Sequence, residues 1–265
     1  MSPQARTWHH GLVARWWAEF NQGGDDVAWF QRALQDSGQP VLDAGCGTGR
    51  LLLPLLRAGI DADGSDAAPD MLDWCRTAAE AEGLSVRLHN QAMHELRLPR
   101  RYRTVIVCGA FGLGGSRAED LEGLRRIRGH LEPGGALILD HHLPNREDPR
   151  GWKAWVERPE LPRPWPSRGD RRRASDGTDL ELRVRQRDLD PLAQTTTLEI
   201  RASQYAGDVE VAAETHTIDI NLYFQKEIEL MLAVAGFRSV AVQAFGEDRP
   251  PEPWKDERIV FRALA

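Results

Sequence analysis

The chain has 265 residues, of which 41% are hydrophobic, and its formal net charge is −6 at pH 7. This length suits one large folded unit or two modest ones. The acidic balance disfavours non-specific nucleic-acid binding, because phosphate contacts need a basic surface. No apolar run approaches the roughly 20 residues of a membrane span. The three cysteines form no CxxC pair, so we expect reduced thiols in a cytoplasmic protein.

The first forty residues are predicted to be helical, because Leu12, Trp16 and Phe20 recur at four-residue spacing and Asp26 can cap a second helix. Strands are expected at residues 41–44, 60–65, 86–89, 104–108 and 136–140. Helical patterns separate several of them, including residues 69–83 and 116–131. Alternation of this kind gives parallel βαβ units. The predicted fold is therefore α/β, with N-terminal helices before a Rossmann-like, doubly wound and mostly parallel sheet.

The pattern changes after Leu143, where prolines punctuate a loop rich in tryptophan and arginine. Two-residue apolar periodicity then predicts an antiparallel β insertion at residues 180–184, 198–202 and 209–213. The apolar parity changes at 216–222, so a β-bulge is expected near Glu214. A helix at 224–235 and strands at 237–245 and 258–263 follow.

This organisation divides the chain into four predicted segments. They are a helical cap (1–40), a ligand-binding core (41–144), a loop and antiparallel β insertion on the substrate side (145–222), and the C-terminal part of the core sheet (223–265). The insertion therefore leaves the core after its fifth strand and returns before its last helix.

The most informative segment is residues 41–50, VLDAGCGTGR. Closely spaced glycines after a strand let the backbone approach a ligand at a helix start. A dinucleotide-binding turn would place glycine or alanine at position 50, where this chain has Arg50, and that disfavours NAD or FAD. Asp66 follows the second strand about 20 residues after Gly45, the usual place for a ribose-binding carboxylate.

The string at 41–49 resembles motif I of the class I S-adenosylmethionine-dependent methyltransferases. Residues 65–72 (SDAAPDML) resemble the family's D-x-S-P-x-M-L segment, and residues 131–139 (LEPGGALIL) resemble its L-x-P-G-G turn and fifth strand. The resemblance covers residues 41–143 well and 224–263 loosely. It implies S-adenosylmethionine as the cofactor and S-adenosylhomocysteine as the product.

The resemblance also implies which residues bind the cofactor. They are Asp43, Ala44, Gly45, Cys46, Gly47, Gly49, Asp66, Ala67, Met71, Gln91, Ala92, Met93, Cys108 and Gly109. Asp43 would lie near the methionine ammonium, and the Asp66 carboxylate would accept both ribose hydroxyls. Gln91 stands where the family often has an aspartate that meets the adenine amino group, and its amide oxygen can accept the same hydrogen bond.

Methyl transfer from a sulfonium needs alignment in a dry pocket, and a histidine base helps an amine or hydroxyl acceptor. His141 and His142 follow the fifth strand at its carboxyl edge and are the candidate catalytic bases. The candidate substrate residues are Trp16, Trp17, Trp152, Trp155, His216 and Tyr223. His216 also fits a core histidine with satisfied hydrogen bonds. No histidine, cysteine and acidic set at ligand spacing indicates a metal site.

The predicted function is methyl transfer from S-adenosylmethionine to a nitrogen or oxygen atom of a small-molecule metabolite. We expect no nucleic-acid or membrane partner and a monomer or homodimer. A nucleic-acid methyltransferase is one alternative, but residues 109–115 read GAFGLGG where amino-methylating members carry N/D-P-P-Y/F. A non-catalytic S-adenosylmethionine-binding protein is another. An NAD-dependent oxidoreductase is the third, and Arg50 counts against it.

Overall fold

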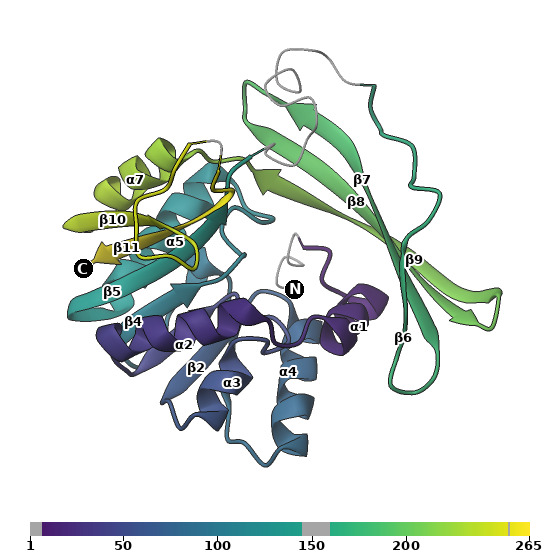
Figure 1. Ribbon diagram of the computed structural model, residues 1–265, viewed down its shortest axis with the longest axis horizontal. Coiled ribbons are helices and arrows are strands. Elements are labelled where there is room, and N and C mark those ends of the chain that lie inside the picture. The colour runs from purple at the N-terminus through teal and green to yellow at the C-terminus, as the bar shows by residue number, and fades with distance from the viewer. Residues whose placement is uncertain (1–6, 145–159, 254) are drawn as a thin grey trace.

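The chain forms two sheets in a computed structural model that describes residues 7–144, 160–253 and 255–265 (Figure 1). The larger sheet has the strand order β10-β11-β5-β4-β1-β2-β3. Its strands are β1 (Val41–Ala44), β2 (Ala62–Asp66), β3 (Arg87–Asn90), β4 (Tyr102–Val107), β5 (Leu131–His142), β10 (Ser239–Ala244) and β11 (Arg258–Leu264). Strands β1 to β5 are parallel, whereas β11 lies antiparallel between β5 and β10. This confirms the predicted mostly parallel α/β sheet.

Helices cover both faces of this sheet because alternate strand residues point to opposite sides. The helices are α2 (Asp25–Ser37), α3 (Leu52–Arg57), α4 (Pro69–Ala81), α5 (Arg117–His130) and α7 (Gln225–Val234), with a short 3₁₀ turn η1 (Met93–Glu95). Leu42 of β1 belongs to the apolar core that includes Leu124 of α5 and Ile228 of α7. Its neighbour Val41 belongs to the core on the other face, with Phe30 of α2.

The smaller sheet is the predicted antiparallel insertion, built from β6 (Asp170–Arg173), β7 (Asp179–Asp190), β8 (Thr195–Ala206) and β9 (Val209–Asn221). Helix α1 (Gly11–Phe20) packs on one face of it, with Val13 and Trp16 against Leu180 and Ile200. In Figure 1 this helix lies between the two sheets. The end of β9 joins the core, where the Asn221 N–H donates to the Gly112 carbonyl over 2.8 Å.

Several expected details differ from the structure. The bulge lies at Val211, because Gln204 pairs with Ala212 while Tyr205 pairs with Glu210; placing it near Glu214 was wrong. Strand β6 was not predicted, since its DRRR sequence lacks any apolar alternation. Helix α2 starts after Gly24 without a side-chain cap, so the capping role expected of Asp26 is also wrong.

Strand β5 is longer than predicted and contains both candidate catalytic histidines. His141 pairs with Ile259 and His142 with Arg258, because β11 returns antiparallel along β5 from Ala136 to His142. The histidines therefore end the strand and do not follow it. The division of the chain into four segments stays a prediction, and Trp152 and Trp155 lie outside the described residues.

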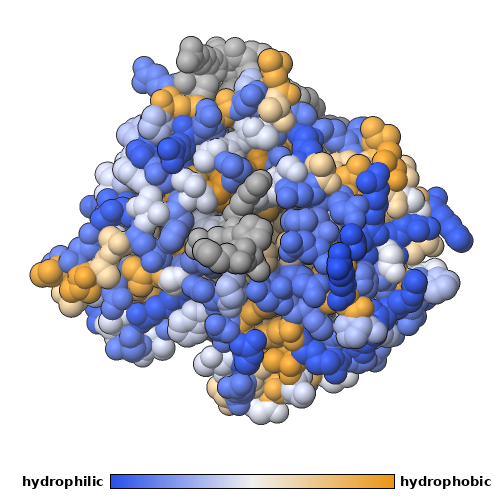
Figure 2. Space-filling view, turned by 180° about the vertical axis from the view of Figure 1, so that it is seen from behind, coloured by the Kyte–Doolittle hydropathy of each residue, from blue (hydrophilic) through white to orange (hydrophobic). Residues whose placement is uncertain are grey.

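Figure 2 shows a largely hydrophilic surface on the face opposite to that of Figure 1, with apolar residues scattered over it. Exposed apolar side chains include Val209 and Val211, which lie in β9 near the hairpin turn that joins it to β8. In the part of the chain that the structure covers, no helix has both the length and the apolar composition to cross a membrane.

Candidate active site

The glycine turn after β1 packs directly against the end of β2. The N–H groups of Gly45 and Cys46 both donate to the Ser65 carbonyl, over 2.7 and 3.0 Å. Gly45 has a φ of +85°, and a Cβ at this position would stand 2.4 Å from the Cβ of Ala110. Only glycine combines this left-handed conformation with so close an approach. The turn therefore packs its backbone against Ala110, where a side chain would otherwise lie.

Asp66 ends β2 and is fixed from two sides. One carboxylate oxygen accepts the Gly47 N–H over 2.9 Å, and the other accepts the Ala68 N–H over 2.8 Å. Burial raises the pKa of Asp66, while these backbone hydrogen bonds act in the opposite direction. Each oxygen keeps a second lone pair, so the oriented carboxylate can still accept two hydroxyl donors.

Asp43 lies beneath the turn in β1 and is 1% exposed. Its Oδ2 atom is buried and has no hydrogen-bond partner among the described residues. Burial raises the pKa of Asp43 to about 7, while Arg50 nearby lowers it and Asp66 raises it. An unpaired buried carboxylate oxygen is costly, and a cationic donor would relieve that cost.

A charge network that sequence reasoning missed holds the neighbouring strand ends. Asp140 of β5 accepts the Gly109 N–H over 2.6 Å and the Arg258 Nε over 2.6 Å. Arg50 donates to Asp26 over 2.7 Å and to the Cys108 sulfur over 3.1 Å. The signal available in the sequence was a lone aspartate at the end of an apolar strand. The network fixes the backbone of 108–109, which follows β4.

The predicted cofactor residues gather at one edge of the sheet, because the parallel strands β1, β2, β3 and β4 all end there. Cβ atoms at Gly45 and Gly47 would lie 3.4 Å from Met93 Cε and 3.2 Å from Met71 Cε. The Gln91 amide oxygen already accepts the Arg97 N–H over 2.7 Å. Its expected hydrogen bond to adenine would therefore use the remaining lone pair.

Asn90 was not among the predicted site residues, yet it ties β3 to the Asp66 loop. Its side-chain amide donates to the carbonyls of Asp66 and Ala67, over 3.0 and 3.1 Å. The only signal of this role in the sequence is an asparagine directly after the strand predicted at 86–89. These two hydrogen bonds set the position of the segment around Asp66, the residue that is predicted to bind the ribose.

Helix α1 connects this edge to the insertion. Trp17 packs toward Ala68 and Met71, beside Asp66, whereas Trp16 packs into the apolar cluster of the insertion sheet. Trp17 also packs against the insertion cluster, so the two tryptophans share that side. Trp17 is the one that the structure brings to the predicted cofactor residues.

The remaining acceptor-side candidates are dispersed. His141 Nε2 lies 2.8 Å from the Tyr223 carbonyl oxygen, so this nitrogen carries the proton and donates it, and burial lowers the pKa of the ring. His142 is exposed at the strand end. Tyr223 is fully buried, and its hydroxyl donates to Asp120 over 2.7 Å. Tyr223 therefore packs in the core, and its expected place in a substrate wall stays a prediction.

The Tyr223 hydroxyl gives a test of this structural role. Tyr223→Phe is expected to lower the free energy of unfolding by about 1–2 kcal/mol, because Asp120 keeps only the Asn221 amide as a side-chain donor. Urea denaturation measures the loss. Donor affinity should stay at the wild-type value, and a large drop in it would contradict a purely structural role.

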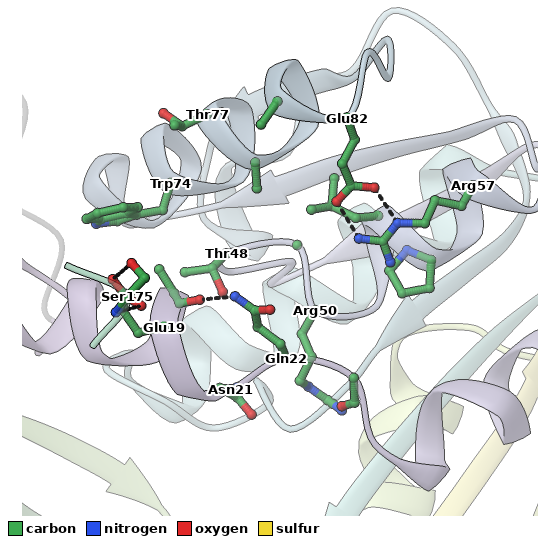
Figure 3. A pocket seen from close by; sticks show the side chains of 17 residues that line it. Glu19, Asn21, Gln22, Thr48, Arg50, Arg57, Trp74, Thr77, Glu82 and Ser175 are labelled. Atoms are coloured by element: carbon green, nitrogen blue, oxygen red, sulfur yellow. Dashed lines mark hydrogen bonds and ion pairs between the residues drawn. The ribbon is translucent and has the colours of Figure 1, made fainter. Parts of the chain in front are cut away.

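A cavity of about 570 Å³ adjoins the outer side of the glycine turn (Figure 3). Trp74 and Thr48 face it, and the ion pair between Arg57 and Glu82 closes one side. Neither Asp43 nor Asp66 lines it. Of the predicted cofactor residues only Gly49 lines it, so the cavity adjoins the glycine turn on the side away from the two carboxylates. Among residues 7–144, 160–253 and 255–265, no three histidine, cysteine or acidic side chains are grouped to hold a metal ion.

Comparison with known proteins agrees with this arrangement. Residues 41–135 match a family model described as a methyltransferase domain. A demethylmenaquinone methyltransferase from Deinococcus radiodurans is 35% identical over 122 residues, which are 44% of this chain and 50% of that protein. The chain thus spans about half the length of the curated relatives that it matches.

Solved structures share the fold over most of both chains. An S-adenosylmethionine-dependent methyltransferase from Clostridium acetobutylicum has a TM-score of 0.68 at 16% identity and covers 90% of this chain and 89% of its own. An amino pentose methyltransferase from Micromonospora echinaspora, with bound S-adenosylmethionine, has a TM-score of 0.61 at 24% identity and covers 90% and 88%. Residues 41–135 are therefore similar to a methyltransferase domain, and the likeness to these solved structures shows a shared fold over most of the chain.

Proposed function

We propose that this protein transfers a methyl group from S-adenosylmethionine to a nitrogen or oxygen atom of a small molecule. The observation that carries the proposal is the pair of carboxylates around the glycine turn. Asp43 has an unpaired buried oxygen, and Asp66 is oriented with lone pairs to spare. The donor's ammonium and its two ribose hydroxyls match these groups in charge and in hydrogen-bonding sense.

The residues at the sheet edge fit the donor as follows. Asp43 would pair with the ammonium, the turn at Gly45 and Gly47 would lie under the methionine chain, and Asp66 would hold the ribose. Met71 and Met93, which reach the turn from either side, would pack on the adenine. The bound donor supplies an electrophilic methyl group on a sulfonium. The protein then needs to align an acceptor and exclude water.

A small acceptor is supported by the position of α1. Its N-terminal end is fastened to both the sheet edge and the insertion, by hydrogen bonds from Gly11 to Asp70 and from Val13 to Glu214. An acceptor would therefore sit between these elements and not on an open surface. The net charge of −6 gives no support to a nucleic-acid substrate. We further propose a cytoplasmic enzyme that acts as a monomer or homodimer.

Asp66→Ala is expected to weaken the binding of S-adenosylhomocysteine by about 1–3 kcal/mol, because buried charge-assisted hydrogen bonds to the ribose are lost. Isothermal titration calorimetry measures the change, and the melting temperature confirms folding. Asp73→Ala is the matched control, since its side chain is 71% exposed on α4, the helix that follows Asp66. Equal affinities for the two variants would refute the ribose assignment.

The transfer reaction itself is tested with isotopically labelled S-adenosylmethionine. Incubation with metabolite extracts, followed by mass spectrometry, is expected to give one or a few labelled small molecules. A protein that binds S-adenosylhomocysteine but labels nothing in any extract would be a non-catalytic binding protein, and the proposed function would then be wrong.

A further inference from the structure

Two histidines and a glutamate meet where the insertion touches the start of α1. Glu214 and His216 lie two residues apart on β9, so both point to the same face of the sheet. His216 Nε2 is 3.3 Å from a Glu214 carboxylate oxygen. The His10 ring, just before α1, lies with its centroid 6.2 Å from that of His216. We call these three residues the acceptor cluster.

The acceptor cluster has unused hydrogen-bonding capacity. The Nε2 atoms of His10 and His216 are both buried, and neither makes a hydrogen bond within the described part of the chain. Buried polar atoms normally have partners, because an unpaired one has lost its hydrogen bonds to water without replacement. Two such atoms beside a carboxylate are therefore typical of a site built for a polar ligand.

The acceptor cluster is also held next to the proposed donor site. Glu214 accepts the Val13 N–H over 3.1 Å, while the Gly11 N–H donates to Asp70 over 2.8 Å. Asp70 lies in the first turn of α4, four residues after Asp66. One turn of α1 thus links the carboxylate of the insertion to the segment that carries the proposed ribose ligand.

We propose, on the basis of the proposed function, that the methyl acceptor is an amine received by the acceptor cluster, with His216 as its base. An ammonium group offers a positive charge to Glu214 and N–H donors to the two imidazole nitrogens, which matches all three groups. A phosphate or carboxylate in the same place would be repelled by the negative charge of Glu214. Asp70, which accepts the Gly11 N–H at the start of α1, would add to this repulsion. The chemistry of the acceptor cluster therefore selects a cation.

The proton and electron balance is simple. The acceptor ammonium gives one proton to His216 Nε2 and becomes a neutral amine. Its nitrogen lone pair forms a bond to the methyl carbon, and the carbon–sulfur electron pair stays on sulfur. The products are a methylated ammonium and S-adenosylhomocysteine, and the imidazolium of His216 then loses its proton to water. His10 and Glu214 hold the nitrogen by hydrogen bonding and charge, and neither forms a covalent bond to it.

The test first identifies which atom of the extract metabolite carries the label, and then measures its methylation by three variants. His216→Asn removes the base, and Glu214→Gln removes the charge while keeping an oxygen that can accept the Val13 N–H. His89→Asn is the matched control, because His89 Nε2 is also buried without a hydrogen-bond partner, 4.0 Å from the Asp63 carboxylate, but lies on β3. Calorimetry with S-adenosylhomocysteine and melting temperatures check each variant for donor binding and folding.

We expect the label on nitrogen, and turnover by His216→Asn reduced about 100-fold or more at saturating donor. Glu214→Gln should mainly raise the KM of the amine, and His89→Asn should resemble the wild type.

Label on oxygen or carbon, or equal turnover by His216→Asn and His89→Asn, would overturn this inference and leave the proposed function intact. The absence of any transfer by the wild type would overturn both. If His216→Asn fails to fold, Glu214→Gln decides the matter, because an unchanged KM for the amine would equally overturn the role of the acceptor cluster.

Discussion

Gly45→Ala is expected to abolish donor binding and to lower the free energy of unfolding by about 2–5 kcal/mol. Part of the loss is the cost of about 1–2 kcal/mol for a side chain in the left-handed region. The rest comes from overpacking, since the new methyl group would stand 2.4 Å from the Ala110 Cβ and must displace the segment after β4. Urea denaturation and calorimetry with S-adenosylhomocysteine measure the two effects.

Gly59→Ala separates these two contributions. Gly59 has a φ of +75°, close to that of Gly45, but a Cβ there would meet no atom within 4 Å. This variant should therefore lose only about 1–2 kcal/mol and keep its donor affinity. If both variants lost the same stability, the contact between the glycine turn and Ala110 would not be as tight as described.

Asp43→Asn is expected to stabilise the free protein at pH 8 by up to about 4 kcal/mol while removing most of its donor affinity. Burial raises the pKa of Asp43 from 3.8 to about 7. The unfolded chain therefore releases this proton near pH 4 and the folded protein only near pH 7, so wild-type stability falls as the pH rises through this interval. Asparagine carries no charge and avoids the loss.

The pH dependence distinguishes this effect from a general gain in packing. The stability difference between Asp43→Asn and the wild type should be small near pH 4, grow up to about pH 7 and then stay constant. Donor affinity of the wild type should be about tenfold weaker at pH 6 than at pH 7.5, because binding an ammonium requires the carboxylate. A stability difference that does not change with pH would contradict a titrating Asp43.

The sequence predicted the central features well because they depend on local chemistry. A glycine-rich turn after a buried strand requires residues that are adjacent in the chain, and Asp66 lies at the end of the very next strand. The core strands were likewise predicted near their observed positions, and β1, β4 and β5 each carry an apolar run of their own. The antiparallel insertion followed from two-residue periodicity in β7, β8 and β9.

The features that sequence reasoning missed join residues far apart in the chain. Arg258 reaches Asp140, and Glu214 reaches Val13 across about two hundred residues, so no local pattern marks either pair. Tyr223 directly follows the insertion, which is why the sequence predicts it in the substrate wall. Its burial depends on Asp120 of α5, which only the packing of the two parts reveals.

The two ends of the insertion lie side by side in the core, where a hydrogen bond joins them. The chain leaves the core after His142 and returns at Tyr223, and His141 donates to the Tyr223 carbonyl over 2.8 Å. The points where the insertion leaves and re-enters the core are thus neighbours. In the folded core the antiparallel unit is therefore a loop whose two ends are held together by the core itself. Because loop-closure entropy grows only slowly with length, strands can be added to or removed from this unit with little cost to the core. Acceptor specificity can therefore diverge while the donor site stays the same.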